Sequence, residues 1–351
     1  MHVVSVVGAR PQFVKLAPIS AAARAAGVEH TIVHTGQHYD RIMSDVFFED
    51  LEIPTPAVNL GVGSGSHGVQ TGAMLAALDD VFAGYAPDWV LVYGDTNSTL
   101  AAALSAVKLH LPVAHLEAGL RSFNRAMPEE HNRILTDHAA DVLLAPTQVA
   151  MGHLADEGLA ARSLLVGDVM ADILLSVKDR LAGLTDAVDK LGCAPGEFYV
   201  ATIHRAENTD DPSRLKGIVD ALASLDKPVA LLAHPRLVVT ARQHGIQLTR
   251  GGLHHHEPLG YSDLMAVVAA SAGVVTDSGG LQKEAFLLRV PCTTVRGETE
   301  WVETLADGWN VLAPLPEEIA VAASRRRPAD TGAMPFGDGH AAEKVMAALL
   351  A

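Results

Sequence analysis

The sequence predicts an α/β protein of two domains, each built on a parallel sheet with helices on both faces. One observation is that short apolar runs alternate with longer Ala-rich amphipathic segments along the chain. Strands and helices that alternate in this way form parallel sheets, because a crossover helix returns the chain to the same edge. A second observation is the length of 351 residues, which exceeds what one hydrophobic core normally supports. A third is that the pattern restarts after KLGCAPGE.

The apolar runs give the expected strands in order. In the first half they are HVVSVVG, HTIVHTG, DWVLVYGD, PVAHLEAG, DVLLAPT and SLLVGD, and in the second half FYVATIHR, VALLAHP, IQLTRG, GVVTDSGG and CTTVRG. We place the first domain at residues 1–172 and the second at 173–335, with the joint near 170–195. Residues 336–351 read as an amphipathic helix that could pack on either domain, for example back on the N-terminal one.

Composition narrows the class of protein. Lys plus Arg is 26 against 41 for Asp plus Glu, a net charge of −15, so broad binding to nucleic acid or a membrane surface is disfavoured. The sequence has no apolar stretch of transmembrane length and no cleavage signal after Met1. Cys193 and Cys292 are the only cysteines, which suits a reducing compartment. We therefore predict a cytoplasmic protein with neither nucleic acid nor membrane as partner.

Polar residues follow the expected strands where each one ends. They are Gly8-Ala9-Arg10, Gln37-His38, Gly94-Asp95-Thr96 and Glu117 in the first half, and His204-Arg205, His234 and Asp277-Ser278-Gly279-Gly280 in the second. Open α/β sheets bind ligands at the carboxyl ends of their strands. If the two sheets turn these edges toward each other, the groups converge on one interdomain cleft, which would be the active site.

The segment HLEAGLRSFNRAMPEEHNR is the most highly charged of these strand ends. It carries three glutamates and three arginines, Glu117, Glu129, Glu130, Arg121, Arg125 and Arg133. Pro128 marks the first position of a helix. Two interpretations are open for Glu129: it belongs to a catalytic site, or it favours the helix N-terminus and pairs with Arg133 one turn later.

GVVTDSGGLQKEAFLL reads as a strand, a Ser-Gly-Gly turn and a helix. Glycines let the backbone approach an anion, and a helix N-terminus offers unpaired N–H groups with a positive dipole end. Ser278, Gly279 and Gly280 are therefore a candidate diphosphate cradle, although an ordinary N-cap has the same pattern. Glu284, one turn later, could accept the two hydroxyls of a ribose or be a solvated helix residue.

Signatures of other cofactors are missing. The sequence has no G-x-x-x-x-G-K-[ST], and GVGSGS at 61–66 does not join a strand to a helix as a dinucleotide fingerprint does, which disfavours NAD. The three histidines at 254–256 are expected on a solvated loop and not around a metal ion. We predict no cofactor and no metal.

Nine motifs in order resemble those of the non-hydrolysing UDP-N-acetylglucosamine 2-epimerases. They are GARPQFVKLAP, TGQH, YGDTNST, HLEAGLRS, MPEEHNR, HRAEN, EPLGY, TDSGGLQKEA and RGETEWVE, and the resemblance runs from residue 3 to about residue 311. It implies two Rossmann-like domains facing across a cleft, of the glycosyltransferase-B type, with a UDP-sugar between them. It also implies a homodimer that needs no cofactor.

The resemblance implies roles for the residues that match its motifs. The implied catalytic residues are Asp95, Glu117, Glu129 and His204, and the implied substrate-binding residues are Arg10, Lys15, Arg133, Ser278, Gly279, Gly280, Glu284 and Arg296. The implied reaction removes UDP together with the C2 proton, passes through a 2-acetamidoglucal, and re-adds UDP with protonation on the other face. Such a route needs a base on one face of the sugar and an acid on the other.

Several alternatives stay open. GARPQF, QTG, HPR and ETEWVE depart from the wording of many family members and resemble a branch that acts on UDP-2,3-diacetamido-glucuronate. The fold also hosts UDP-sugar glycosyltransferases, and hydrolysing epimerases and non-catalytic UDP-sugar sensors are further possibilities.

Some bacterial family members hold a second, activating UDP-N-acetylglucosamine beside the active site. Here Gln37 of that segment remains, but Asp40 replaces a later glutamine and Ala73 replaces an arginine. An Asp repels a diphosphate and an Ala donates nothing to it. We therefore predict that the activator site is absent or very weak.

Overall fold

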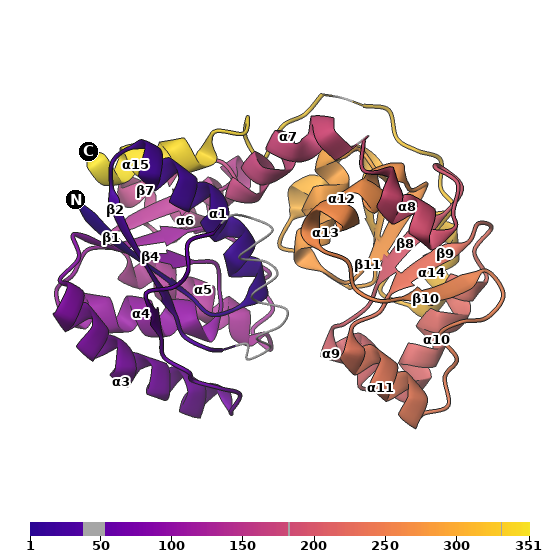
Figure 1. The fold of residues 1–351 in the computed structure, drawn as a ribbon, viewed down its shortest axis with the longest axis horizontal. Coiled ribbons are helices and arrows are strands. Elements are labelled where there is room, and N and C mark those ends of the chain that lie inside the picture. Colours follow the sequence, from indigo (N-terminus) through magenta and orange to yellow (C-terminus); the bar gives the residue numbers. More distant parts are fainter. Residues whose placement is uncertain (38–52, 182, 331) are drawn as a thin grey trace. The chain divides into compact units, whose positions relative to one another are not determined.

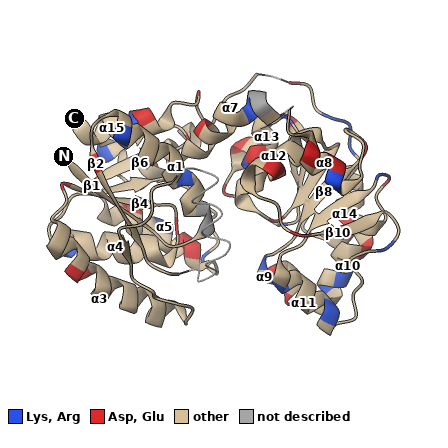
Figure 2. Cartoon of the chain, in the orientation of Figure 1, with Lys and Arg blue, Asp and Glu red and all other residues tan. Residues whose placement is uncertain are grey.

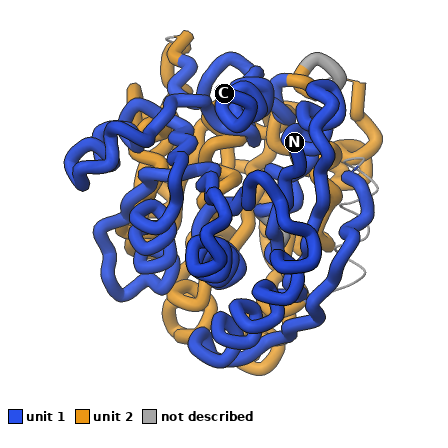
Figure 3. Tube along the Cα trace, turned by 90° about the vertical axis from the view of Figure 1, so that its left-hand side faces the viewer, with its two compact units in different colours: residues 1–175, 334–351 blue, residues 176–333 orange. Residues whose placement is uncertain are grey.

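The computed structural model describes the chain except for residues 38–52, 182 and 331, and the side chains of residues 10, 11, 179 and 180. It forms two compact units, one of residues 1–175 with 334–351 and one of residues 176–333 (Figures 1 and 3). Each unit contains one parallel sheet, so the predicted α/β class with two Rossmann-like domains is confirmed. No helix of the described part is both long and apolar enough to cross a membrane.

The first unit contains a seven-stranded sheet in the order β3-β2-β1-β4-β5-β6-β7. Its strands are β1 (His2–Val7), β2 (Glu29–His34), β3 (Val58–Asn59), β4 (Trp89–Tyr93), β5 (Val113–Leu116), β6 (Val142–Ala145) and β7 (Ser163–Leu165). Its helices are α1 (Arg10–Ala25), α3 (His67–Tyr85), α4 (Asn97–Lys108), α5 (Pro128–Ala139), α6 (Gln148–Asp156), the 3-10 helix η1 (Ala160–Arg162), most of α7 (Val169–Leu181) and α15 (Ala341–Leu350). In Figure 1, α1 and α15 cover one face of the sheet, and α3, α4 and α5 cover the other.

The second unit contains a six-stranded sheet in the order β10-β9-β8-β11-β12-β13. Its strands are β8 (Tyr199–Thr202), β9 (Val229–Leu232), β10 (Leu253–His256), β11 (Gly273–Thr276), β12 (Cys292–Thr294) and β13 (Asn310–Leu312). Its helices are α8 (Thr185–Leu191), α9 (Ala206–Thr209), α10 (Pro212–Ala223), α11 (Pro235–Gln243), α12 (Tyr261–Ala270), α13 (Gly279–Leu287), the 3-10 helix η2 (Val302–Gly308) and α14 (Pro316–Ala323).

The strands are short and apolar because helices cover both faces of the sheets. Among the strands that the structure describes, Glu29 is the only Asp, Glu, Lys or Arg, and in Figure 2 the charged residues lie mainly on helices and loops. Central strands such as Trp89–Tyr93 and Val229–Leu232 are almost wholly buried. Uninterrupted apolar runs of this kind are typical of parallel sheets buried on both faces.

Both sheets place their first strand beside their fourth. β1 pairs with β4 in the first unit, and β8 pairs with β11 in the second. Strand order reverses at these two positions, and ligands of open α/β sheets bind beyond the carboxyl ends of strands at such a switch point. The loops after β1 and β4, and those after β8 and β11, are therefore the first places to look for a site.

The last helix belongs to the first unit. α15 packs against α1, and Val345, Met346 and Leu349 join the same apolar core as Leu16 and Ile19. The carboxylate of Asp172 on α7 accepts the backbone N–H groups of residues 341 and 342, at 3.0 and 2.7 Å, and so caps this helix.

One strand of the second unit was predicted at the wrong place. The run IQLTRG was expected to be a strand and the histidines after it a loop, but β10 is Leu253–His256. Ile246 instead follows the C-terminus of α11, where its N–H donates to the Ala241 carbonyl (2.8 Å) after Gly245 has turned the chain at φ +66°. An edge strand tolerates polar side chains that face solvent, which is why a run of histidines can form β10.

Candidate active site

Glu117 lies directly beyond the end of β5 in an unusual backbone conformation. Its φ is +73°, a region that costs energy for any residue with a side chain. The carboxylate forms an ion pair with the Lys15 ammonium group from α1, and both side chains are less than one-tenth exposed. A buried pair of opposite charges beside a switch point is a candidate for proton transfer or anion binding.

Gly94, after β4, makes room for this pair. Its φ is +62°, and a Cβ at this position would lie 3.0 Å from Glu117 Oε2 and 3.3 Å from Lys15 Nζ. Glycine is therefore favoured at this position for two reasons, the backbone conformation and the space that the ion pair occupies.

Asp95, the next residue, is held by Arg133 from α5. The guanidinium group contacts Asp95 Oδ2 from Nε (2.9 Å) and Nη2 (2.7 Å), and within the described part of the chain Oδ1 accepts no hydrogen bond. Asn132 donates to the Asp95 carbonyl at 2.9 Å. The carboxylate side chain is 30% exposed, so it is fixed in orientation but remains accessible to a ligand.

Glu130 is a structural residue. Its carboxylate lies 2.7 Å from Arg133 Nη1 and accepts the backbone N–H groups of Ser122 and Phe123 at 2.9 and 2.8 Å. Burial raises the pKa of the Glu130 carboxyl, but these N–H groups, the Ser122 hydroxyl and the charge of Arg133 together outweigh burial, and the net pKa is lowered. Glu130 thus anchors the loop before α5.

The pairing of Glu129 with Arg133, one of the two interpretations, is wrong. Arg133 pairs with Glu130 and Asp95. Glu129 is half-buried in the first turn of α5, and no hydrogen bond or ion pair of the described chain involves its carboxylate. Since it is not used by a neighbouring side chain, it remains available to a ligand.

Gln12 lies in the motif GARPQFVKLAP but was not among the predicted site residues. Its carbonyl oxygen accepts the N–H groups of Gly8 (2.8 Å) and Ala9 (3.0 Å), and its amide donates to the Tyr93 carbonyl (2.8 Å). It therefore ties the loop after β1 to the end of β4 at the switch point. Arg10 begins α1, but its side chain is not described, and His38 and Asp40 lie outside the described residues.

In the second unit, His204 and Asp277 follow β8 and β11, the strands of the switch point. Asp277 is fully buried and lies 2.9 Å from His204 Nδ1, and it also accepts the backbone N–H of Arg205 and the amide of Asn208. Burial raises the pKa of the Asp277 carboxyl, but the hydrogen bond and charge of His204, with the hydrogen bonds from Asn208 and the Arg205 N–H, together outweigh burial and lower the pKa. With Nδ1 occupied, the half-exposed ring has Nε2 left for a ligand.

Ser278, Gly279 and Gly280 begin α13 beside this dyad. Ser278 is the N-cap, with its Oγ 3.5 Å from the N–H of Leu281, so the N-cap interpretation is correct for this side chain. A Cβ on Gly279 would lie 2.6 Å from Glu300 Oε1, so this glycine is also required by a neighbouring side chain. All three residues are partly exposed at the positive end of the helix, which leaves an anion-binding role open.

Two further predicted residues of the second unit are buried, Glu284 on α13 and Arg296 in the loop after β12. Arg296 donates to Glu300 Oε2 at 2.9 Å, while its Nη1 is buried without a hydrogen-bond partner in the described part of the chain. An unsatisfied buried guanidinium nitrogen is costly unless a ligand or water accepts from it. Glu284 is 6% exposed, so it is not the solvated helix residue that one interpretation offered.

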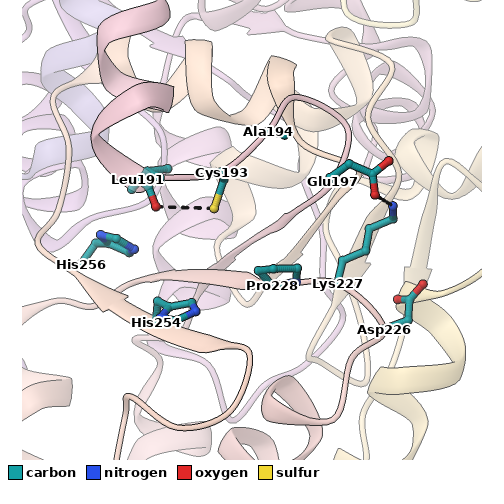
Figure 4. A pocket seen from close by; sticks show the side chains of 10 residues that line it. Leu191, Cys193, Ala194, Glu197, Asp226, Lys227, Pro228, His254 and His256 are labelled. Atoms are coloured by element: carbon teal, nitrogen blue, oxygen red, sulfur yellow. Dashed lines mark hydrogen bonds and ion pairs between the residues drawn. The ribbon is translucent and has the colours of Figure 1, made fainter.

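A pocket of about 470 Å³ in the second unit lies elsewhere. Cys193, Lys227, His254 and His256 line it, which places it near the amino ends of β8 and β9 and along β10 (Figure 4). Lys227 is paired with Glu197, and Cys193 donates to the Leu191 carbonyl at 3.6 Å. Residues of the described chain form no group of three metal ligands here or elsewhere. The residues that line it include neither His204 nor Asp277, nor any residue of α13.

Two Rossmann-like sheets with charged and polar groups beyond the carboxyl ends of their strands define an α/β protein of the glycosyltransferase-B class. A model of the family described as UDP-N-acetylglucosamine 2-epimerase matches residues 20–350. The chain belongs to the UDP-N-acetylglucosamine 2-epimerase family, which confirms the resemblance found in its motifs.

Relatives and solved structures agree with this assignment. A UDP-N-acetylglucosamine 2-epimerase homolog of Methanococcus maripaludis is 44% identical, with 99% of each chain covered. The UDP-2,3-diacetamido-2,3-dideoxy-D-glucuronate 2-epimerase of Pseudomonas aeruginosa is 45% identical, with 98% of each covered. The crystal structure of Methanocaldococcus jannaschii UDP-GlcNAc 2-epimerase in complex with UDP-GlcNAc and UDP has a TM-score of 0.92 at 37% identity, covering 100% of this chain and 99% of that one.

Proposed function

We propose that the protein is a UDP-sugar 2-epimerase that interconverts UDP-N-acetylglucosamine and UDP-N-acetylmannosamine. The observation that carries the proposal is the pair of carboxylates beyond β4 and β5, Asp95 held by Arg133 and Glu117 held by Lys15. Family membership supplies the reaction class, and these two groups supply its acid–base chemistry. A homodimer in the cytoplasm is the form in which we expect the enzyme to act.

The chemistry explains why carboxylates are needed. The C2 proton of an N-acetylhexosamine is not adjacent to a carbonyl, so its removal is coupled to cleavage of the bond between C1 and the UDP oxygen. The products are 2-acetamidoglucal and UDP. Re-addition of UDP to C1 with protonation of C2 on the other face gives the epimer. One carboxylate takes the proton and another group delivers one, and Asp95, Glu117 and Glu129 are the candidates.

The neighbours of these carboxylates suit that task. Arg133 contacts Oδ2 of Asp95, and among the described residues no group donates to Oδ1, so Oδ1 is placed to take a proton. Lys15 next to Glu117 stabilises the ionised carboxylate electrostatically, and the ammonium group balances charge as the proton moves. Glu129, which is half-buried, is the third candidate.

Groups of the second unit suit the departing UDP. Negative charge develops on the diphosphate as the C1–O bond breaks, and N–H donors that are already oriented stabilise it best. We assign this role to the N-terminus of α13 with Ser278 and Gly280, to His204 through Nε2, and to Arg296 through its unpaired Nη1. Arg10 is assigned to the diphosphate from its motif alone, and Glu284 to the ribose hydroxyls.

A second candidate substrate is UDP-2,3-diacetamido-2,3-dideoxy-glucuronate. The relative from Pseudomonas aeruginosa that carries this name is as similar to the chain as the homolog from Methanococcus maripaludis. The reaction at C1 and C2 is the same for both sugars, so the carboxylates do not distinguish them. Substituents at C3 and C6 decide the choice.

The test is incubation of the purified protein with each of the two UDP-sugars in deuterated water, followed by NMR. The proposal expects reversible interconversion of the C2 epimers, with deuterium at C2 of the recovered pool and nearly all nucleotide still attached to sugar. Stoichiometric free UDP would indicate a hydrolysing epimerase, and consumption only with an added acceptor would indicate a glycosyltransferase. C2 that stays unlabelled at equilibrium would refute the proton-transfer route.

A further inference from the structure

A buried histidine lies between the two carboxylate loops. His115 is on β5, two residues before Glu117, and is fully buried. Its Nε2 lies 2.7 Å from the carbonyl oxygen of Gly94, the residue before Asp95. A carbonyl oxygen only accepts hydrogen bonds, so Nε2 carries the hydrogen and donates it.

The other side of the ring is fixed just as firmly. His115 Nδ1 lies 2.6 Å from Oδ1 of Asp137 on α5. The second oxygen of Asp137 accepts the backbone N–H of Gly119 (3.1 Å) and lies 2.7 Å from Arg121 Nη1. Burial raises the pKa of the Asp137 carboxyl, but the charges and hydrogen bonds of His115 and Arg121 together outweigh burial, and the net pKa is lowered.

Asp137 therefore holds both the histidine and the loop that follows Glu117. Gly119 comes two residues after Glu117, and its N–H is tied to the same carboxylate that orients the imidazole. The hydrogen bond from His115 Nε2 to the Gly94 carbonyl then links the fixed imidazole to the loop that carries Asp95. The two carboxylate loops share one buried support.

A small movement of the Gly94 peptide would affect both carboxylates. Gly94 is in contact range of the Glu117–Lys15 pair, because a Cβ there would lie 3.0 Å from Glu117 Oε2. The next residue is Asp95, whose carboxylate Arg133 orients from α5. A shift of this peptide therefore changes the position of both carboxylates together. Misplacement of reacting groups by about 1 Å costs on the order of 10²-fold in rate.

We propose that His115 is a positioning residue for the epimerisation, which sets the relative placement of Asp95 and Glu117 by donating to the Gly94 carbonyl while Asp137 orients its ring. The inference rests on the proposed function. It assigns to His115 no contact with the sugar, so its effect is on the catalytic constant and not on binding of UDP.

Two amide substitutions separate the two bonds of the ring. His115→Asn places an amide nitrogen near the position of Nδ1, which keeps the bond to Asp137 and loses the one to Gly94. His115→Gln places an amide nitrogen near Nε2, which keeps the bond to Gly94 and loses the one to Asp137. We expect kcat to fall at least about tenfold in H115N and clearly less in H115Q, with the Kd for UDP within about twofold of the wild type in both.

His30→Asn is the control, at a partly buried histidine of the same unit. His30 bonds to Ser5 Oγ at 2.8 Å and has no role in the proposed site. We expect H30N to lose stability without a fall in kcat at a temperature where it is folded. Equal loss of kcat in H115N and H115Q, or an equal loss in H30N, would overturn the inference.

A double-mutant cycle tests the route of the effect. If His115 acts through the Asp95 loop, adding H115N to Asp95→Asn should cost less than about threefold more in kcat, because the shared effect is already lost. Fully additive losses would overturn the inference. If the wild type interconverts no UDP-sugar, the proposed function fails by itself. Crystal structures of H115N and H115Q then decide: a Gly94 carbonyl displaced by about 1 Å in H115N alone supports positioning, and an unmoved carbonyl refutes it.

Discussion

Substitution of Gly94 by alanine tests whether the space beside the Glu117–Lys15 pair is needed for turnover. Gly94 has φ +62°, and a non-glycine residue in this left-handed region costs about 1–2 kcal/mol. The new Cβ would also lie 3.0 Å from Glu117 Oε2 and 3.3 Å from Lys15 Nζ. Both atoms are at the ends of side chains, so the pair can move aside by a few tenths of an ångström, but at the cost of its alignment.

We expect G94A to lose about 1–2 kcal/mol of unfolding free energy and about 10–100-fold in kcat. UDP affinity should be unchanged, because Gly94 and the Glu117–Lys15 pair are not among the groups assigned to UDP. Urea unfolding, NMR turnover and calorimetry with UDP measure the three quantities. Gly27 is the matched control, since its φ is +67° and a Cβ added there would meet no atom within 4 Å. G27A should lose similar stability and keep its turnover. Normal kcat in G94A, or an equal loss in G27A, would refute the reasoning.

Three further predictions concern the site and the core of the first unit. Replacing Asp95 by Asn or Glu117 by Gln keeps the shape of the side chain and removes its basicity, so kcat should fall on the order of 10²-fold with the fold retained by circular dichroism; near-normal turnover in both would return these residues to a structural role. Burial, aided by the charge of His2, lowers the pKa of His30 to about 4 in the folded state. Below about pH 6.5 the unfolded chain therefore binds a proton that the folded chain does not. The free energy of unfolding should fall as the pH is lowered from about 6.5 to 4. The loss is about 2 kcal/mol between pH 8 and pH 5, and urea unfolding of H30N should show a flatter profile; an unchanged profile would contradict the assignment. Ala73 is exposed on α3 and has no group that could donate to the phosphates of an activating UDP-N-acetylglucosamine. Pure UDP-N-acetylmannosamine should therefore be converted with hyperbolic kinetics and without an added activator. A lag that a trace of UDP-N-acetylglucosamine abolishes would reveal an activator site.

The sequence was informative where local chemistry and local structure coincide. Pro128 at the start of a helix and Ser278 at the N-cap of another were predictable, because each residue is favoured at its position by its own backbone or side chain. The strand ends that carry Asp95 and Glu117 were predictable because apolar runs mark buried parallel strands. These residues needed only their neighbours along the chain.

Other features depend on partners that are distant in sequence. His115 looks like one more residue of an apolar strand, and its role depends on Asp137, 22 residues away, and on Gly94, 21 residues away. The positive φ of Glu117 has no sequence signal, because glutamate rarely adopts it. The histidines of β10 were predicted to lie on a loop because three consecutive polar residues are not typical of a strand. They form an edge strand because they pair with β9. Tertiary pairing decided each of these cases.

The position of α15 determines which of the two units can complete its fold earlier during synthesis. Residues 176–333 are contiguous, so the whole sequence of the second unit is made before residues 334–351 of the first unit. The first unit is not complete at that point, because Val345, Met346 and Leu349 belong to its core and the carboxylate of Asp172 caps α15, which is made after the second unit. Until α15 is made, the apolar face of α1 lacks its cover, so the unit whose synthesis starts before that of the other is completed after it.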